Sequence, residues 1–322
     1  MRFTFRSVLN KFIGLHSYDP KHSKTKLPGP LFIQVQTIDR CNGSCRMCPY
    51  VTIQRSGPPN CMDEELYTKI FTNLSQAETV NTVLLMLQNE PLLDNELEKR
   101  VEQARKILGN GTRILTVTNG TSLNLKRYEA LLHAGLNSIE VSIDAFYEET
   151  YRSIRPGLDF SNVINNINTL LQKKDGSHIV VRFLKQRANE NEEKQFKHYW
   201  KSRGVQICSF PIENRAGMIE CFDQMRGSSP LLRKKYIRAV RDLVFPPCFF
   251  PFYALNILWD GRVILCCHDW RHIEIIGDLS AQSLQDVWNG DAINQYRNLL
   301  YNKRFEEIPI CKDCSVVRRF SG

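Results

Sequence analysis

The chain has 322 residues, of which 42% are hydrophobic and 24% are charged. This composition is typical of a globular protein with a large core, and it excludes collagen-like, disordered and disulfide-scaffold classes. No apolar run reaches the roughly 18–20 residues that a membrane span needs. The net charge is +9, but residues 1–30 carry five of these charges, so nucleic-acid binding is disfavoured. We interpret residues 1–30 as a basic arm that lies on the protein or contacts a membrane or partner.

The eleven cysteines form two main groups near opposite ends of the chain. No secretory signal precedes them, because charged residues interrupt the apolar stretch at the N-terminus. We therefore expect a reducing, cytoplasmic compartment, where cysteines serve metal binding or catalysis more often than disulfides. The grouping itself predicts two separate sites.

Strand-like and helical patterns alternate from residue 31 to about 210. Asp63, followed by two glutamates, predicts the start of one helix. Six such units imply parallel strands with right-handed crossovers. Because eight units close a barrel, we expect an α/β fold with an open, partial (β/α)6 barrel. The six predicted strands are residues 31–35, 83–87, 114–117, 138–143, 179–183 and 205–210.

The pattern changes after residue 215. A helix is expected at 231–244, and Asp260-Gly261 between apolar runs predicts a β-hairpin. The chain is thus divided into a basic arm (1–30), a core (31–215), a linker helix region (216–244) and a small C-terminal domain (245–322).

Several chemically useful residues follow predicted strands. Ligand sites of parallel α/β folds lie beyond the C-terminal ends of the strands. Cys41, Glu90, Asn119 and Asp144 each follow or close a predicted strand. We therefore expect these side chains at one site.

Cys41, Cys45 and Cys48 form a C-x3-C-x2-C loop after the first strand. Three thiolates fall short of the four ligands of a structural zinc site, whereas a [4Fe–4S] cluster held by three cysteines leaves one iron open for a small molecule. The spacing and its place resemble the radical S-adenosylmethionine (SAM) superfamily. The resemblance implies a radical SAM barrel whose cluster binds SAM and cleaves it to a 5′-deoxyadenosyl radical, which abstracts hydrogen from the substrate.

The resemblance also implies residues that bind SAM. Glu90 and Pro91 match the end of the family's Gly-Gly-Glu-Pro segment, which binds the SAM amino group, although Gln88 and Asn89 replace both glycines. Asn119 is assigned to the same cofactor site from its place after the third strand.

Two further strands supply cofactor candidates. Ser142 and Asp144 match the family's polar pair for the ribose hydroxyls. Arg182 is predicted to pair with the SAM carboxylate, or to form a salt bridge at the barrel rim.

Cys248, Cys266 and the pair Cys311 and Cys314 make the second group. Such pairs hold zinc or an iron–sulfur cluster. The spacing between Cys248 and Cys266 resembles the SPASM and twitch domains of radical SAM enzymes. This implies an auxiliary [4Fe–4S] cluster with four cysteine ligands, and zinc is the alternative. Cys267 is interpreted as a packed thiol or a substitute ligand.

As a whole, the chain resembles the 2-deoxy-scyllo-inosamine dehydrogenase group. The resemblance implies an oxidoreductase that acts on a sugar, aminocyclitol or similar small molecule and passes an electron to the auxiliary cluster. It implies Arg215 as a substrate-binding or catalytic residue, and flavodoxin or ferredoxin as electron donor. Cys208 in the last strand keeps an epimerase open, because a thiol there could donate hydrogen. A peptide-modifying maturase and a non-enzymatic iron–sulfur or zinc module also stay open.

Overall fold

The computed structural model describes residues 27–53, 57–173, 176–227 and 247–318. Most of the basic arm and the helix expected at 231–244 lie outside these residues. A single nine-stranded sheet runs through the described part in the order β6-β5-β4-β3-β2-β1-β7-β8-β9. Neighbouring strands are parallel from β6 to β7, and β8 and β9 are antiparallel additions.

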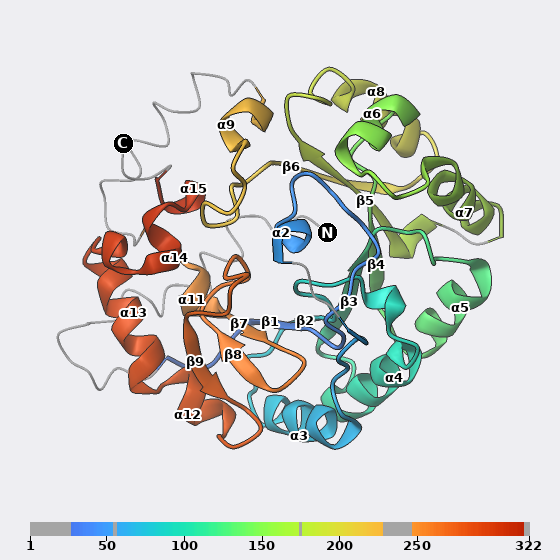
Figure 1. Ribbon diagram of the computed structural model, residues 1–322. Helices are drawn as coiled ribbons and strands as arrows, with labels where there is room; N and C mark the ends of the chain where they lie inside the picture. Colours follow the sequence, from blue (N-terminus) through green and yellow to red (C-terminus); the bar gives the residue numbers. More distant parts are fainter. Residues whose placement is uncertain (1–26, 54–56, 174–175, 228–246, 319–322) are drawn as a thin grey trace.

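Figure 1 shows the sheet as an open arc with α3, α4, α5 and α7 along its outer side. All six predicted strands are present and follow one another in sequence order across the sheet, which confirms the open α/β arrangement. The strands are β1 (Phe32–Val35), β2 (Thr82–Leu84), β3 (Arg113–Thr118), β4 (Ser138–Ser142), β5 (Ile179–Lys185), β6 (Gln206–Pro211), β7 (Ala254–Ile257), β8 (Arg262–Ile264) and β9 (Ile275–Asp278). The α-helices are α2 (Tyr50–Ile53), α3 (Glu64–Ser75), α4 (Leu97–Leu108), α5 (Leu125–His133), α6 (Glu148–Ile154), α7 (Phe160–Lys173), α8 (Glu193–Lys201), α9 (Phe222–Met225), α11 (Phe250–Tyr253), α12 (Leu284–Trp288), α13 (Asp291–Tyr301), α14 (Pro309–Lys312) and α15 (Ser315–Arg318). Short 3-10 turns occupy Pro91–Leu93, Gly176–His178 and Phe305–Glu307.

Local sequence explains why these elements form where they do. The Asp63 carboxylate accepts hydrogen bonds from the backbone N–H of Glu65 at 2.8 Å and of Leu66 at 3.3 Å, which confirms the predicted helix start. In β1, the alternate residues Ile33 and Val35 are buried in the main core. Period-two alternation therefore turns the residues between them toward the inside of the arc.

The inner face of the sheet has its own small apolar cluster, formed by Leu84, Leu115 and Val117. In the register, Leu84 lies level with Leu115 on one side and with Gln34 of β1 on the other. Residues level with one another in a parallel sheet share a face. The inner face is thus apolar near β2 and β3 and becomes polar at β1.

β7 joins the C-terminal part of the chain to the barrel. It pairs in parallel with β1, with Gln34 level with Asn256. β7 continues into β8 through a turn where Gly261 has φ 90°, a conformation that glycine adopts without strain. The predicted hairpin is confirmed. The loop after β1 carries the first cysteine group, and the loop after β8 carries Cys266 and Cys267 of the second.

None of the helices in the described ranges combines the length and the hydropathy that crossing a membrane requires.

Candidate active site

The first cysteine loop is fixed to the barrel by its backbone. The N–H of Ser44 donates to the carbonyl of Pro156 at 3.3 Å, and the N–H of Arg46 donates to Ile154 at 3.0 Å. Within the loop, the N–H of Cys48 donates to the carbonyl of Cys45 at 3.0 Å. These bonds hold the loop against the end of α6.

The three thiols of this loop suit an iron–sulfur cluster. Burial is the main reason that the pKa of Cys41 rises to about 12 and that of Cys48 to about 11, and the neighbouring thiols raise both further. The Cys41 sulfur accepts the N–H of Gly43 at 3.4 Å. Thiolates in such a place need compensating positive charge, which a bound metal cluster supplies, and N–H groups directed at sulfur are typical of cluster sites. Within the described residues, no three His, Cys, Asp or Glu side chains converge as a site for one metal ion.

Arg155, directly after α6, is a site residue that sequence analysis missed. Its guanidinium donates through Nη1 to the Cys45 sulfur at 3.4 Å and through Nε to Asp144 Oδ2 at 3.0 Å. Burial alone would lower the pKa of Arg155, but the Asp144 carboxylate and the Cys45 thiol reverse this and raise it. A permanent cation therefore lies beside one of the three thiols and favours its thiolate form.

Glu90 connects the cysteine loop with β3. Its N–H donates to the carbonyl of Arg40 at 2.7 Å, and its carboxylate accepts hydrogen bonds from Leu92 N–H, the Thr118 hydroxyl and Asn119 N–H. Burial raises the pKa of this carboxyl, which the three hydrogen bonds partly offset. The predicted contact with the SAM amino group stays a prediction, and the structure does place Glu90 beside the loop.

Asn119 also contacts the cysteine loop. Its amide nitrogen donates to Asn42 Oδ1 at 2.7 Å, and its amide oxygen accepts from the backbone and hydroxyl of Thr121. Asn119, Glu90 and Asp144 are thus gathered around the three thiols, as their positions after strands predicted. A direct role of Asn119 in cofactor binding stays a prediction.

Asp144 is occupied by protein partners. It adopts φ 62°, is buried, and accepts the Leu184 N–H at 2.6 Å through the carboxylate oxygen that does not bind Arg155. Its carbonyl accepts from Asn189 at 2.6 Å. The contact of Asp144 with the SAM ribose stays a prediction. In the structure, the Asp144 carboxylate also holds the Arg155 guanidinium in place. Ser142, the other half of the predicted pair, is half-buried two residues earlier.

Arg182 and Cys208 are level with each other on β5 and β6, and Ser142 is level with Arg182 on β4. The guanidinium of Arg182 lies 3.2 Å from Glu140 and stacks 4.8 Å from the centre of the Phe210 ring. The structure therefore contains a salt bridge at this position, and binding of the SAM carboxylate stays a prediction. Burial raises the pKa of the half-buried Cys208 thiol.

The second cysteine group has five thiols that lie within electrostatic reach of one another. They come from three separate segments of the C-terminal part of the chain, namely Cys248, the adjacent Cys266 and Cys267, and the pair Cys311 and Cys314. Burial is the main reason that the pKa of Cys248 rises to about 12, and the thiols of Cys314 and Cys267 raise it further. Cys266 and Cys267 share a hydrogen bond that lowers the pKa of Cys267 and raises that of Cys266. This donor set is sufficient for a cluster with four thiolate ligands.

A polar group of Glu213, Arg215 and His268 lies beside the second site. Arg215 Nη1 is 3.0 Å from His268 Nε2, and the Glu213 carboxylate is 3.3 Å from the same nitrogen. Burial would lower the pKa of His268, but the Cys267 thiolate, the Cys314 sulfur and Glu213 raise it to about 9.

Arg215 lies within electrostatic reach of both cysteine groups, because its charge lowers the pKa of Cys48 and of Cys267. Arg215 and Ala216 adopt φ 50° and 56°, and such strained conformations cluster at functional sites. Asn214 fixes this turn by donating to the Asp313 carbonyl at 2.6 Å. Arg215 therefore lies next to His268 at the second site and within electrostatic reach of Cys48 at the first, and its role with a substrate stays a prediction.

Gln88, two residues before Glu90 of the first site, forms hydrogen bonds to the second cysteine segment. Its buried amide nitrogen donates to the carbonyls of Cys267 at 3.1 Å and Asp269 at 3.0 Å, and its amide oxygen lies 2.9 Å from His272 Nε2. Gln88 replaces the first glycine of the Gly-Gly-Glu-Pro segment. The replaced position therefore carries a side chain that holds the loop after Cys266.

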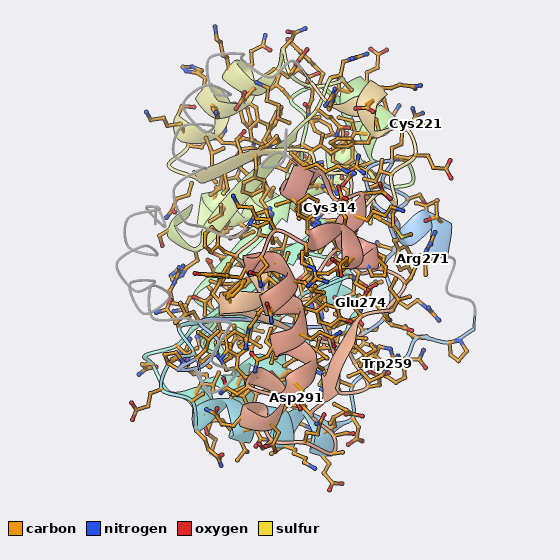
Figure 2. The ribbon with its side chains drawn as sticks, turned by 90° about the vertical axis from the view of Figure 1, so that its left-hand side faces the viewer. Cys221, Trp259, Arg271, Glu274, Asp291 and Cys314 are labelled. Carbon is orange, nitrogen blue, oxygen red and sulfur yellow. The ribbon has the colours of Figure 1, made fainter. Side chains whose placement is uncertain are left out.

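A cavity of about 510 Å³ opens beside both loops. Its lining includes Asp39, Met218, Trp259, Trp270 and His272. Figure 2 shows the labelled Trp259 and Arg271 on the same side of the C-terminal part of the chain. Another cavity, of about 540 Å³, lies at the N-terminal ends of β1 and β2. Because ligand sites of parallel α/β folds lie beyond the C-terminal ends of the strands, we place the chemistry at the cavity beside the cysteine loops.

Comparison with known families agrees with this geometry. Residues 35–191 match the model of the radical SAM superfamily, and residues 248–315 match that of the iron–sulfur cluster-binding domain SPASM. The chain is 21% identical over 288 residues to the S-adenosyl-L-methionine-dependent 2-deoxy-scyllo-inosamine dehydrogenase of Niallia circulans, covering 88% of this chain and 92% of that enzyme. It is 27% identical over 184 residues to the GTP 3′,8-cyclase of Limosilactobacillus fermentum, a match that spans about half of that enzyme (52%).

Solved structures show the same fold. BtrN in complex with AdoMet and 2-DOIA superposes with a TM-score of 0.60 at 19% identity, over 89% of this chain and 93% of that chain. SuiB of Streptococcus suis bound to the precursor peptide SuiA superposes with a TM-score of 0.67 at 11% identity, over 98% of this chain and 75% of that chain.

Proposed function

The chain is a radical SAM enzyme with a C-terminal SPASM domain, and from this premise we propose that it oxidises a carbinol of a small polar molecule to a carbonyl. The observation that carries the proposal is the place of Arg215, which lies 3.0 Å from His268 beside the second thiol site and whose charge also lowers the pKa of Cys48 at the first. A substrate held there would lie between the two cysteine groups. The related dehydrogenase from Niallia circulans makes an aminocyclitol or sugar the first class to test.

The two groups of thiols would hold different cofactors. Cys41, Cys45 and Cys48 would hold the cluster that binds SAM, and Cys248, Cys266, Cys311 and Cys314 would hold the auxiliary cluster, with Cys267 as a substitute ligand. When bound, these groups supply a 5′-deoxyadenosyl radical for hydrogen abstraction and an acceptor for the electron that the substrate radical loses. An external one-electron donor such as flavodoxin or ferredoxin would supply the electron for SAM cleavage.

The protein's own residues would orient the substrate and take its proton. Arg215 presents N–H donors to a substrate hydroxyl, and Glu213, which is partly exposed, offers a carboxylate beside it. The Glu213 carboxylate would take the O–H proton of the carbinol, while the bound groups would accept its C–H hydrogen atom and one electron. A carbonyl results, and the oxidation is balanced.

A second function is favoured by Cys208. It lies level with Arg182 on the inner face of the sheet and is half-buried. A thiol there can return a hydrogen atom to a substrate radical, which would produce an epimer instead of a ketone.

The experiment is anaerobic reconstitution followed by incubation with SAM, a reductant and 2-deoxy-scyllo-inosamine or related polyols in D2O. Oxidation predicts one ketone per 5′-deoxyadenosine. Deuterium at a product C–H without net oxidation, lost on Cys208→Ala, would instead establish the epimerase. SAM cleavage stimulated only by peptides would overturn the small-molecule assignment.

A further inference from the structure

The turn that carries Arg215 is bound to the last cysteine pair of the second site. The N–H of Asn214 donates to Ser315 Oγ at 3.0 Å, and the N–H of Ser315 donates to Asn214 Oδ1 at 2.8 Å. The Asn214 side-chain nitrogen donates to the Asp313 carbonyl at 2.6 Å. Three hydrogen bonds therefore connect Asn214 to the residues directly before and after Cys314, although residues 214 and 315 are 101 positions apart.

A close steric contact accompanies these hydrogen bonds. We call residues 214–217 the Arg215 turn and residues 311–315 the cysteine-pair segment. Gly217 of the Arg215 turn has φ 80°, and a Cβ atom there would lie 2.9 Å from Asp313 Cβ. Since carbon atoms that are not bonded do not approach so closely, a larger residue would push the two segments apart.

The backbone of the Arg215 turn is strained and needs support from its surroundings. Arg215 and Ala216 have φ 50° and 56°, and Gly217 follows with φ 80°. Residues that carry a Cβ atom disfavour this left-handed region. The backbone hydrogen bond that closes the turn, from the N–H of Met218 to the Arg215 carbonyl, is long at 3.2 Å. Strained backbone persists only where neighbouring structure fixes it, and the cysteine-pair segment supplies that support.

The cysteine-pair segment has little local structure of its own. It lies on α14 and α15, which have four residues each. Single helical turns are unstable without tertiary support. Cys311 and Cys314 are buried and are two of the four proposed ligands of the auxiliary cluster. Because a bound cluster fixes the segments that ligate it, loading of the auxiliary cluster would order this segment and, through it, the Arg215 turn.

The Arg215 turn also forms part of the proposed substrate site. Arg215 Nη1 lies 3.0 Å from His268 Nε2, and Met218, directly after the turn, lines the cavity of about 510 Å³. A shift of the turn would therefore move both the N–H donors of Arg215 and one side of this cavity.

We propose that Asn214, Gly217 and Ser315 are positioning residues that make substrate binding depend on the auxiliary cluster. The cysteine-pair segment, once its cluster is bound, holds the Arg215 turn in its strained conformation, and only then can Arg215 hold a substrate. The proposal rests on the proposed function for the role of Arg215. A chain without the auxiliary cluster has no acceptor for the electron of a substrate radical, so this coupling keeps such a chain from starting a reaction that it cannot finish.

The first test is hydrogen–deuterium exchange of the peptide that contains residues 214–219, measured anaerobically by mass spectrometry. In the reconstituted parent this peptide should be protected. In Cys311→Ala, Cys314→Ala, which lacks two ligands of the auxiliary cluster, its exchange should be at least about tenfold faster, because each hydrogen bond that opens contributes roughly fivefold to the opening equilibrium. Helix α5, on the outer side of the sheet, should exchange equally in both proteins.

The second test is Gly217→Ala, which breaks the contact and leaves every cluster ligand in place. Its added methyl group meets Asp313, so we expect faster exchange at 214–219 with the iron content of the parent. With 2-deoxy-scyllo-inosamine as the probe, KM should rise at least about tenfold, while SAM cleavage without substrate keeps the parent rate. Ser315→Ala, which removes the hydroxyl that accepts the Asn214 N–H, is the second variant if Gly217→Ala does not fold.

Gly204→Ala is the matched control. Gly204 has a similar φ of 73°, but a Cβ atom there would meet nothing within 4 Å. The variant carries the same kind of backbone strain and should lower the Tm slightly, with the exchange at 214–219 and the KM both unchanged.

Two results would overturn the proposal. Equal exchange at 214–219 in the parent and in Cys311→Ala, Cys314→Ala would show that the cluster does not order the turn. Faster exchange in Gly217→Ala with an unchanged KM would show that the turn does not position a substrate donor. A parent with cluster-dependent exchange that does not oxidise the probe would refute only the proposed function. A parent that oxidises the probe without this dependence would refute only the coupling, so the two failures are distinguishable.

Discussion

The two cysteine sites differ in how the chain builds them. The first takes three thiols from one loop of eight residues, 41–48, and places a single buried cation, Arg155, beside Cys45. The second takes five thiols from three segments spread over residues 248–314 and surrounds them with the mixed charges of Glu213, Arg215 and His268.

The two sites therefore differ in how far the fold depends on their thiols. The first loop is already fixed by backbone hydrogen bonds to Ile154 and Pro156, so its thiols are available for cofactor binding without being needed for the fold. The second site takes its thiols from segments that lie far apart in the sequence, so a cluster there would also crosslink the C-terminal part of the chain. Three thiolates leave an iron open to SAM, whereas four or five close the coordination.

The largest expected effect is loss of SAM cleavage on changing Cys41, Cys45 and Cys48 together to Ala. No 5′-deoxyadenosine should form above background, because no thiolate remains to hold the cluster. Circular dichroism and Tm should change little, since strands and helices make the core. The double variant Cys61→Ala, Cys221→Ala, which removes two exposed thiols, is the control and should cleave SAM normally. Cleavage by the triple variant would refute the first site.

The next effect separates SAM cleavage from product formation. In Cys311→Ala, Cys314→Ala, iron should fall from about eight to about four per chain, because one of two cubane clusters is lost. Ketone formation should disappear while some 5′-deoxyadenosine formation persists. Because this site also joins segments, folding is first checked by circular dichroism. Product at the parent rate from a folded variant would remove the electron-acceptor role, and one tightly held zinc with about four iron in the parent would favour a structural site.

A smaller effect concerns the buried cation of the first site. Arg155→Met leaves the Asp144 carboxylate buried without its partner, and breaking a buried pair costs about 3–5 kcal/mol. We expect that loss in the free energy of unfolding, measured by denaturant titration. Arg152→Met in the adjoining helix α6 removes an exposed arginine that pairs with Glu148 and should cost less than about 1 kcal/mol. Equal losses in both variants would show that Arg155 is not a compensating charge.

Local patterns were enough to predict most of the barrel and the cysteine sites. Strand runs, the Asp63 cap and the turn at Asp260-Gly261 depend on residues close in sequence, and so does the spacing of Cys41, Cys45 and Cys48. These features carry their geometry within a few residues, so a single sequence reveals them.

The missed features depend on contacts between distant segments. Arg155 meets Cys45 across 110 residues, and Gln88 meets Cys267 across 179. Neither residue belongs to a local hydrophobic period, and Gln88 stands out in the sequence only because it replaces a glycine of the family segment. The pairing of β1 with β7 was equally hidden, because strand neighbours far apart in sequence are set by the whole sheet.

The smallest expected effect tests the contact between the sites. Gln88→Gly restores the glycine of the family segment and removes the hydrogen bonds to Cys267, Asp269 and His272. Each such bond contributes about 1 kcal/mol, so we expect ketone formed per 5′-deoxyadenosine to fall by about three- to tenfold as the loop beside the second site loosens. The electron paramagnetic resonance signal of the auxiliary cluster should broaden with it. Gln103→Ala, which removes an amide on the outer helix α4, should leave both unchanged. A lower Tm with an unchanged product ratio and signal would mean that Gln88 stabilises the fold without coupling the two sites.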